Sequence, residues 1–135
     1  MVRTRLAPVD AMRRLRSVLE EDMKFRILEE SPDGMQLITS PRHFATDTGP
    51  GQPAGGRQYY TQLLIRLSAR EGGTEISITP HNYELRTSYA YSSEGQIRTL
   101  YKIYPYEEYP GMFDLIPLLN ELSYSASAIQ LGLAQ

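Results

Sequence analysis

The sequence predicts an α+β fold of the two-layer sandwich type: a helix, a five-stranded antiparallel meander and a second helix. Three observations predict it: apolar residues at helical spacing near both ends, alternating apolar and polar residues between them, and short turn motifs separating the alternating segments. Strands joined by short turns pair in sequence order, and both amphipathic helices then need the one apolar sheet face available. Both helices are therefore expected on one face of the sheet. The chain has 135 residues, of which 41% are hydrophobic and 22% charged, and this suits a single α+β domain over residues 1–135.

The first helix is predicted over residues 7–22. Its apolar residues recur at spacings of three and four, and Pro8 falls in the first turn, where its missing N–H costs nothing. Residues 1–6 precede the helix without a pattern of their own and are expected to form a flexible N-terminus. The apolar residues of the helix are Val9, Met12, Leu15, Leu19 and Met23.

Two short strands, over residues 24–30 and 35–40, flank the motif Ser31-Pro32-Asp33-Gly34 and predict a β-hairpin. Proline presets φ, and glycine accepts the positive φ at the end of the turn. Residues 45–56, ATDTGPGQPAGG, contain four glycines and two prolines. This composition predicts a mobile loop.

A long strand is predicted over residues 57–70, and the turn Glu71-Gly72-Gly73 joins it to a second long strand over residues 74–91. The phase of alternation changes within the second strand, because Ile78 stands at an even position and Tyr83 at an odd one. Proline cannot donate to a strand ladder, so we expect a bulge or break at Pro80-His81-Asn82. The apolar face of the first long strand comprises Tyr59, Thr61, Leu63, Ile65, Leu67 and Ala69.

The last strand is predicted over residues 96–105, with Ile97, Thr99, Tyr101 and Ile103 on one face. The second helix is expected to begin at Leu115, after a cap at Asp114 and with Pro117 in its first turn. Phe113 is expected to pack against Leu118 across this cap. The apolar stripe of this helix comprises Leu115, Leu118, Leu119, Leu122, Ala126 and Ile129.

A resemblance to a known family follows from the order of these elements. The segment AMRRLRSVLEEDMKFRILEESPDGMQLITS, a glycine-rich gap, and RQYYTQLLIRLSAREGGTEISI together resemble the BamC-like helix-grip domains of bacterial envelope lipoproteins. In those domains a helix precedes a strand pair with an Asp-Gly turn, and later strands meet at a Gly-Gly-Thr or similar turn. The resemblance covers residues 7–80 and implies a non-enzymatic envelope domain that docks on partner proteins.

The residue inventory argues against most site chemistry. Without cysteine the chain has no disulfide, thiolate zinc ligand or cysteine nucleophile. His43 and His81 are the only histidines and lack carboxylates at metal-ligand spacing, so no metal site is predicted. Ser40 near His43 lacks the G-x-S-x-G context of a hydrolase nucleophile. Glu107 and Glu108 are adjacent and point to opposite sides of an extended segment, so they do not form a catalytic pair. From these observations together we predict neither an enzyme nor a cofactor.

Charge and hydropathy limit the partners and the compartment. The formal net charge of −2 gives the chain no overall basic field that would attract nucleic acid. Residues 71–135 are acidic on balance, with eight acidic and three basic residues. No stretch approaches the roughly 20 apolar residues that span a bilayer. The first ten residues, MVRTRLAPVD, lack the apolar core of a signal peptide. A leader or a lipidation cysteine outside this sequence would change the compartment, which stays open between the cytoplasm and the periplasm.

Tyrosines provide the candidate interaction surface. Nine of the ten tyrosines lie between Tyr59 and Tyr109, and Pro105 and Pro110 stiffen the stretch that contains the last of them. Tyrosine is common at binding surfaces because its ring is large and rigid and has a polar tip. The alternative is that tyrosine simply has a high strand propensity and covers the sheet. The candidate surface comprises Tyr60, Tyr104, Tyr106, Glu107, Glu108 and Tyr109.

The predicted function is that of a non-catalytic binding or protein-interaction module, with a protein partner or a second copy of the chain as its ligand. The alternative is a carrier of a small hydrophobic ligand, held in a cavity between the sheet and the C-terminal helix. That cavity would be lined by Leu63, Ile65, Tyr101 and Leu119.

Overall fold

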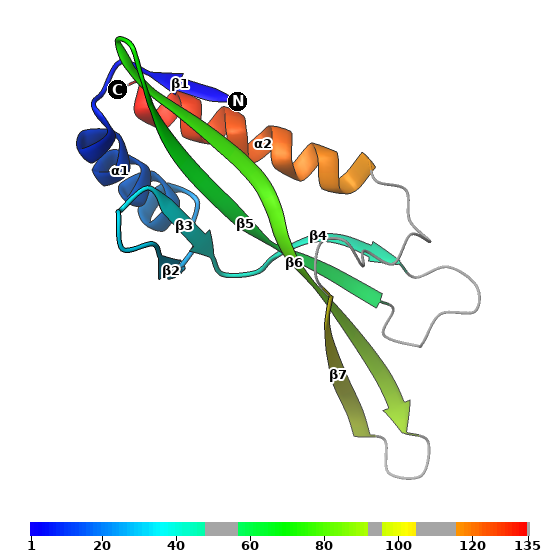
Figure 1. Cartoon of the computed structure of the whole chain (residues 1–135). Coiled ribbons are helices and arrows are strands. Elements are labelled where there is room, and N and C mark those ends of the chain that lie inside the picture. Colours follow the sequence, from blue (N-terminus) through cyan, green and yellow to red (C-terminus); the bar gives the residue numbers. More distant parts are fainter. Residues whose placement is uncertain (48–56, 92–95, 105–115, 135) are drawn as a thin grey trace.

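The computed structural model describes residues 1–47, 57–91, 96–104 and 116–134, and these contain two helices and seven strands (Figure 1). The helical elements are α1 (Pro8–Ser17), which continues into a π-helical turn η1 (Val18–Asp22), and α2 (Ile116–Leu133). The strands are β1 (Val2–Thr4), β2 (Ile27–Glu30), β3 (Gln36–Thr39), β4 (Arg42–Asp47), β5 (Arg57–Arg70), β6 (Gly73–Tyr91) and β7 (Gln96–Tyr104).

All seven strands belong to one antiparallel sheet, which is built around the long hairpin of β5 and β6. Strands β3 and β4 pair with different parts of β5, while β1 and β7 pair with different parts of β6. Strand β2 pairs with β3. The predicted meander is confirmed, because β2, β3, β5, β6 and β7 are neighbours in this order.

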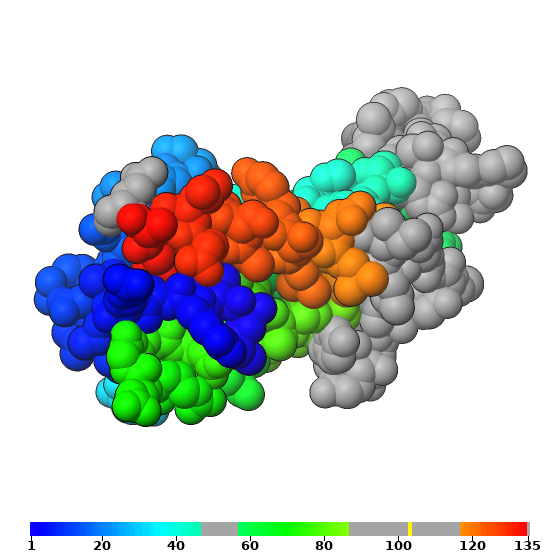
Figure 2. All heavy atoms as spheres, turned by 90° about the horizontal axis from the view of Figure 1, so that it is seen from above, coloured from blue at the N-terminus to red at the C-terminus, as the bar shows by residue number. Residues whose placement is uncertain are grey.

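Both helices lie on one face of the sheet, so the predicted two-layer α+β fold is confirmed (Figure 1). Figure 2 shows α2 lying beside the N-terminal segment that contains β1. The C-terminal end of α2 packs closely on η1, since a Cβ at Gly132 would overlap the side chain of Val18. The buried apolar core comprises Val2, Ala11, Met12, Leu15, Val18, Leu19, Met23, Phe25, Leu37, Leu63, Ile65, Leu67, Ile76, Ile129 and Leu133.

The predicted bulge in β6 is confirmed. The pairing step from Thr61 to Leu63 on β5 faces a longer step from Pro80 to Tyr83 on β6, so β6 carries one extra residue there. Ile76 and Tyr83 are consequently both buried, although one has an even number and the other an odd one. The residues of β5 that the alternation predicts to be buried, from Tyr59 to Leu67, are buried as predicted.

Beyond the bulge, β6 runs alongside β7, and we call Tyr83–Tyr91 together with Gln96–Tyr104 the arm. Nine consecutive residue pairs join its two strands without a register shift. Strand β5 also flanks the base of the arm, but its pairing with β6 ends at Thr87. Figure 1 shows the arm extending away from α1 and α2.

Two strands were not predicted from the sequence. Val2–Thr4 lies in the segment expected to be flexible, yet it pairs with β6, and Val2 is 2% exposed. Arg42–Asp47 takes in the first three residues of the expected loop 45–56 and pairs with β5; residues 48–56 lie outside the described residues. Strand β1 is short and pairs with a strand distant in sequence, whereas β4 pairs with the next strand of the chain and overlaps the glycine- and proline-rich stretch 45–56.

Three further expectations need correction or stay open. Strand β2 begins at Ile27 rather than residue 24, because Lys24 has a φ of 62° and Phe25 turns into the core. Leu119 is 57% exposed rather than part of the buried stripe, and Ser125 occupies a fully buried position instead. The expected cap at residues 113–115 lies outside the described residues, whereas Pro117 lies in the first turn of α2 as predicted.

Gly73→Ala is expected to disrupt the pairing of β1 with β6. A Cβ at Gly73 would overlap the carbonyl oxygen of Thr4, so one strand must move, at a cost of about 2 kcal/mol or more in unfolding free energy. Thermal denaturation followed by circular dichroism measures this loss. Gly72→Ala is the matched control: its Cβ would have no neighbour within 4 Å, and only its positive φ costs about 1 kcal/mol. Equal losses in the two variants would contradict the close approach of β1.

Candidate functional site

A cluster of polar and aromatic side chains lies on the sheet face opposite α1 and α2. It consists of His43 in β4, Tyr60 in β5, and Glu84 and Arg86 in β6, and we call it the Tyr60 cluster. Tyr60 lies opposite His43 on one side and Glu84 on the other. Because successive residues of a strand point to opposite faces and Tyr59 is buried towards the helices, Tyr60 points away from them.

Tyr60 is fixed from several sides. The guanidinium carbon of Arg86 lies 3.9 Å from the centre of the Tyr60 ring, a cation–π arrangement, and the His43 ring meets it edge-on at a centroid distance of 5.4 Å. The Tyr60 hydroxyl donates a hydrogen bond to Oε1 of Gln58 at 3.1 Å. Arg86 donates from Nε to Oε1 of Glu84 at 2.7 Å. The half-buried ring is therefore held in one orientation.

The structure places two of the predicted site residues in different rows of the ladder. Tyr60 belongs to the row that contains Glu84 and Ile103, whereas Tyr104 lies opposite Tyr83 in the neighbouring row. The other four predicted residues, Tyr106, Glu107, Glu108 and Tyr109, lie outside the described residues. The described members of the predicted surface are thus Tyr60 and Tyr104, in neighbouring rows of the ladder.

Ile103 extends the row of the Tyr60 cluster onto β7. It lies opposite Glu84 and is 65% exposed, which is high for an isoleucine in a sheet. The sequence predicts Ile103 on an apolar strand face, and the pairing with Glu84 puts it on the uncovered face instead of in the core. Apolar surface therefore adjoins the polar and aromatic side chains of the cluster.

Sequence reasoning missed three members of the Tyr60 cluster. The sequence suggests His43 only as a metal ligand or a catalytic base, and no sequence pattern singles out Glu84 or Arg86. The bulge at residues 80–82 was the available signal. It fixes the phase of β6 relative to β5 and places Glu84 opposite Tyr60, but the pairing register was needed to use it.

A second group of polar side chains lies between the sheet and α2. Arg42 extends from β4, stacks its guanidinium 3.8 Å from the centre of the Phe25 ring and donates a hydrogen bond to the carbonyl oxygen of Met23. Nη1 of Arg42 also lies 3.8 Å from Oε1 of Glu121 in α2. A single side chain thus connects β4, the end of η1 and α2.

Glu121 lies in an environment that disfavours its charge. Burial raises the pKa of its carboxyl above the ordinary value, while the positive charge of Arg42 and the hydroxyl of Ser125 lower it. In the described part of the chain, neither Oε1 of Glu121 nor Oγ of Ser125 has a partner within ordinary hydrogen-bond geometry. The Ser125 hydroxyl therefore acts on Glu121 as a nearby dipole. This group holds the two layers together and includes no nucleophile–base pair.

The serine and histidine considered for catalysis have separate partners. Oγ of Ser40 accepts a hydrogen bond from the backbone N–H of Arg26 at 3.0 Å. Nε2 of His43 lies 2.6 Å from Oγ1 of Thr46. Within the described ranges, no three histidine, aspartate or glutamate side chains gather closely enough to hold a metal ion.

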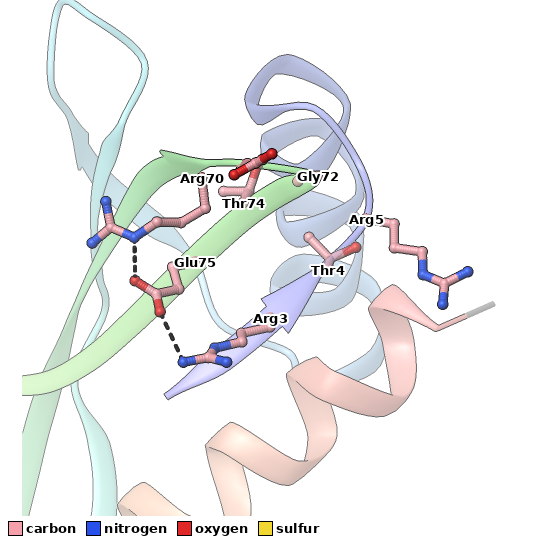
Figure 3. Close-up of a pocket in the computed structure, with 9 residues that line it drawn as sticks. Arg3, Thr4, Arg5, Arg70, Gly72, Thr74 and Glu75 are labelled. Atoms are coloured by element: carbon pink, nitrogen blue, oxygen red, sulfur yellow. Dashed lines mark hydrogen bonds and ion pairs between the residues drawn. The ribbon is translucent and has the colours of Figure 1, made fainter.

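A shallow pocket of about 570 Å³ lies where β1 meets the tip of the β5–β6 hairpin (Figure 3). Arg3 and Arg70 both point towards Glu75 and form ion pairs with it at 3.2 and 2.7 Å. The two guanidinium groups already share one carboxylate and are largely exposed, so they offer little attraction to an external anion. These ion pairs therefore connect β1 to the hairpin tip.

The residues expected to line a ligand cavity are not arranged around one. Leu63 and Ile65 are fully buried in the packed core, and Leu119 is exposed. The side chain of Tyr101 lies outside the described part. Two pockets in the described part lie at the hairpin tip and beside β2, away from the space between the sheet and α2. The carrier alternative thus gains no support from these residues.

Glu121 and Asp33 are expected to change stability with pH in opposite directions. The pKa of Glu121 is raised above 4.5 on folding, so its contribution to stability is fully present below about pH 4.5 and is lost as the pH rises through the folded pKa. Hydrogen bonds from Ser31 and the N–H of Met35 lower the pKa of Asp33 below 3.8. The contribution of Asp33 is therefore present above pH 3.8 and is lost as the pH falls through its folded pKa.

Urea unfolding at a series of pH values, from about pH 3 to pH 7, measures both effects. Glu121→Gln should remove the decline of unfolding free energy above pH 4.5, and Asp33→Asn should remove part of the decline at acidic pH. Each variant serves as the control for the other. A Glu121→Gln profile parallel to that of the wild type would show that Glu121 is not perturbed.

Comparison with protein families and curated proteins finds no match. The sequence matches no protein-family model, and no curated protein is significantly similar to it. Neither helix, over its described residues, is long and apolar enough to cross a membrane. The functional argument therefore depends on the geometry of the chain itself.

Proposed function

We propose that the chain is a non-catalytic protein-interaction module whose contact surface combines the Tyr60 cluster with the arm. One observation carries the proposal: on the sheet face opposite the helices, a fixed tyrosine and arginine adjoin an exposed isoleucine. Tyrosine and arginine are the residue types enriched at the energetic centres of interfaces. Ile103 supplies apolar area beside them.

The Tyr60 cluster is ordered before any partner arrives. Binding normally costs about 0.5–1.5 kcal/mol for each flexible side chain that becomes fixed. The contacts of Tyr60 with Arg86, His43 and Gln58, and the bond from Arg86 to Glu84, already restrict these side chains. A partner would therefore bind side chains that the fold has already ordered, and little further side-chain entropy would be lost on binding.

The sequence supports a larger surface than the cluster alone. Strand β7 ends at Tyr104 and leads into the segment that contains Tyr106, Glu107, Glu108 and Tyr109. This aromatic and acidic segment follows the base of the arm, where Tyr104 pairs with Tyr83, and would extend the contact from there. The partner is a protein or a second copy of this chain.

A bacterial envelope assembly of the lipoprotein type is the setting that we propose for this module. The support is the order of elements over residues 7–80 and the placement of both helices on one sheet face, as in a helix-grip domain. This placement leaves the opposite face and the arm available for a partner.

Site-specific photo-cross-linking tests the proposed surface. A benzoylphenylalanine placed at position 103, in cells of the source organism, should give a discrete cross-linked product, because Ile103 lies within the contact. Leu131 is the matched control, since it is a similarly exposed apolar residue, at 69%, on α2. Products of equal yield at both positions, or none at position 103, would overturn the proposal.

Tyr60→Ala is expected to weaken this contact while leaving the fold intact. The half-buried ring contributes about 1 kcal/mol or less to folding but, as an interface centre, about 1.4 kcal/mol or more to binding. The cross-linking yield from position 103 should then fall about tenfold. Tyr124→Ala provides the control, because Tyr124 is 60% exposed on α2. Similar yields from the two tyrosine variants would remove Tyr60 from the interface.

A further inference from the structure

The edges of the sheet differ in how they are protected against pairing with another strand. An exposed strand edge presents unpaired N–H and C=O groups, and proteins blunt such edges with short strands, bulges or charged side chains. Strand β1 has only three residues. Strand β2 is bulged at Leu28, and β4 is bulged at Phe44, as their register shifts show. Three edges of the described sheet are thus short or irregular.

Strand β7 is neither short nor bulged, and its charged residues, Arg98 and Lys102, are both basic. It is nine residues long, pairs with β6 through nine consecutive residues without a shift and, within the described residues, pairs on that side only. Nine strand residues span roughly 30 Å, which is enough for an added strand of the same length. The opposite edge of β7 therefore has regular backbone geometry for strand addition.

The charge of the arm determines which kind of strand its edge attracts. Strand β7 contains Arg98 and Lys102 and no acidic residue. From residue 71 to the end the chain has eight acidic and three basic residues, and all three basic residues, these two and Arg86, lie in the arm. The arm is thus a basic element within an acidic half of the chain.

We propose that the free edge of β7 binds an extended acidic segment of a partner protein as an additional strand of the sheet. This inference rests on the proposed interaction function and names its partner class. Backbone hydrogen bonds would supply affinity, and acidic side chains facing Arg98 and Lys102 would supply selectivity. Exposed Ile103 would contact an apolar residue of the same segment.

A second copy of β7 fits this edge poorly. Pairing two copies would bring four positive charges into one ladder, two from each strand, with no negative charge to balance them. Antiparallel pairing centred on Leu100 would place Arg98 directly opposite Lys102. Like charges facing each other across a ladder are destabilising, so the charge pattern favours an acidic partner strand.

Selection from a display library of random nine-residue peptides, against the purified full chain, tests the inference. We expect the enriched peptides to carry net negative charge and to lack proline. A synthetic copy of the most enriched peptide should bind the double variant Arg98→Glu/Lys102→Glu at least about tenfold more weakly than the wild type. Bound peptide should also slow backbone amide exchange in β7 while leaving exchange in α2 unchanged.

The matched control is Arg13→Glu/Arg14→Glu, which makes the same charge change on the exposed face of α1 and should leave peptide affinity within about twofold. The inference is overturned if no peptide is enriched, if enriched peptides are neutral or basic, or if amide exchange in β7 does not slow. Partner cross-linking at position 103 would then still support the interaction module. A cross-linked product of twice the chain mass would replace the acidic segment with a second copy.

Discussion

The ladder between β5 and β6 is the interaction on which the rest of this molecule depends. Every other strand except β2 pairs directly with one of these two, and β2 reaches the sheet through β3. The core residues Leu63, Ile65 and Ile76 come from the same hairpin and meet α1, η1 and α2. A shift of one residue in this ladder would turn each of these side chains to the opposite face. The register of β5 against β6 therefore fixes the core and the Tyr60 cluster together.

The extra residue in β6 divides this hairpin into two parts with different roles. On the side of Ile76, β6 pairs with β1 and lies under the helices. On the side of Tyr83 it pairs with β7, and the ribbon leaves the helical layer. The bulge changes the phase so that Tyr83 stays buried while Glu84 joins Tyr60 on the opposite face. Alternate residues of β6 thus belong to the core and to the Tyr60 cluster.

The main architecture could be predicted because it depends on patterns long enough to be read locally. The alternation of Tyr59, Thr61, Leu63 and Ile65 predicted their burial, and the change of phase between Ile78 and Tyr83 within β6 predicted the bulge. Strand β1 could not be predicted because it is short and pairs with a strand distant in sequence, and β4 was missed because half of its six residues lie in the glycine- and proline-rich stretch 45–56. The Tyr60 cluster could be predicted only at Tyr60. Cross-strand pairing places the other members beside Tyr60. Predicting that pairing requires the register of the strands, which the composition does not give.

The division of the β5–β6 hairpin at the bulge also connects the stability of the arm with its proposed role. A two-stranded ribbon is marginally stable by itself, and stability usually requires a third strand or a packed layer. Strand β5 provides that third strand only as far as Thr87 on β6, so the outer part of the arm has two strands within the described residues. A partner strand on the free edge of β7 would complete this part of the sheet. Binding and ordering of the arm would then be linked, because the edge proposed to bind the partner is also the part of the sheet that gains most from being paired.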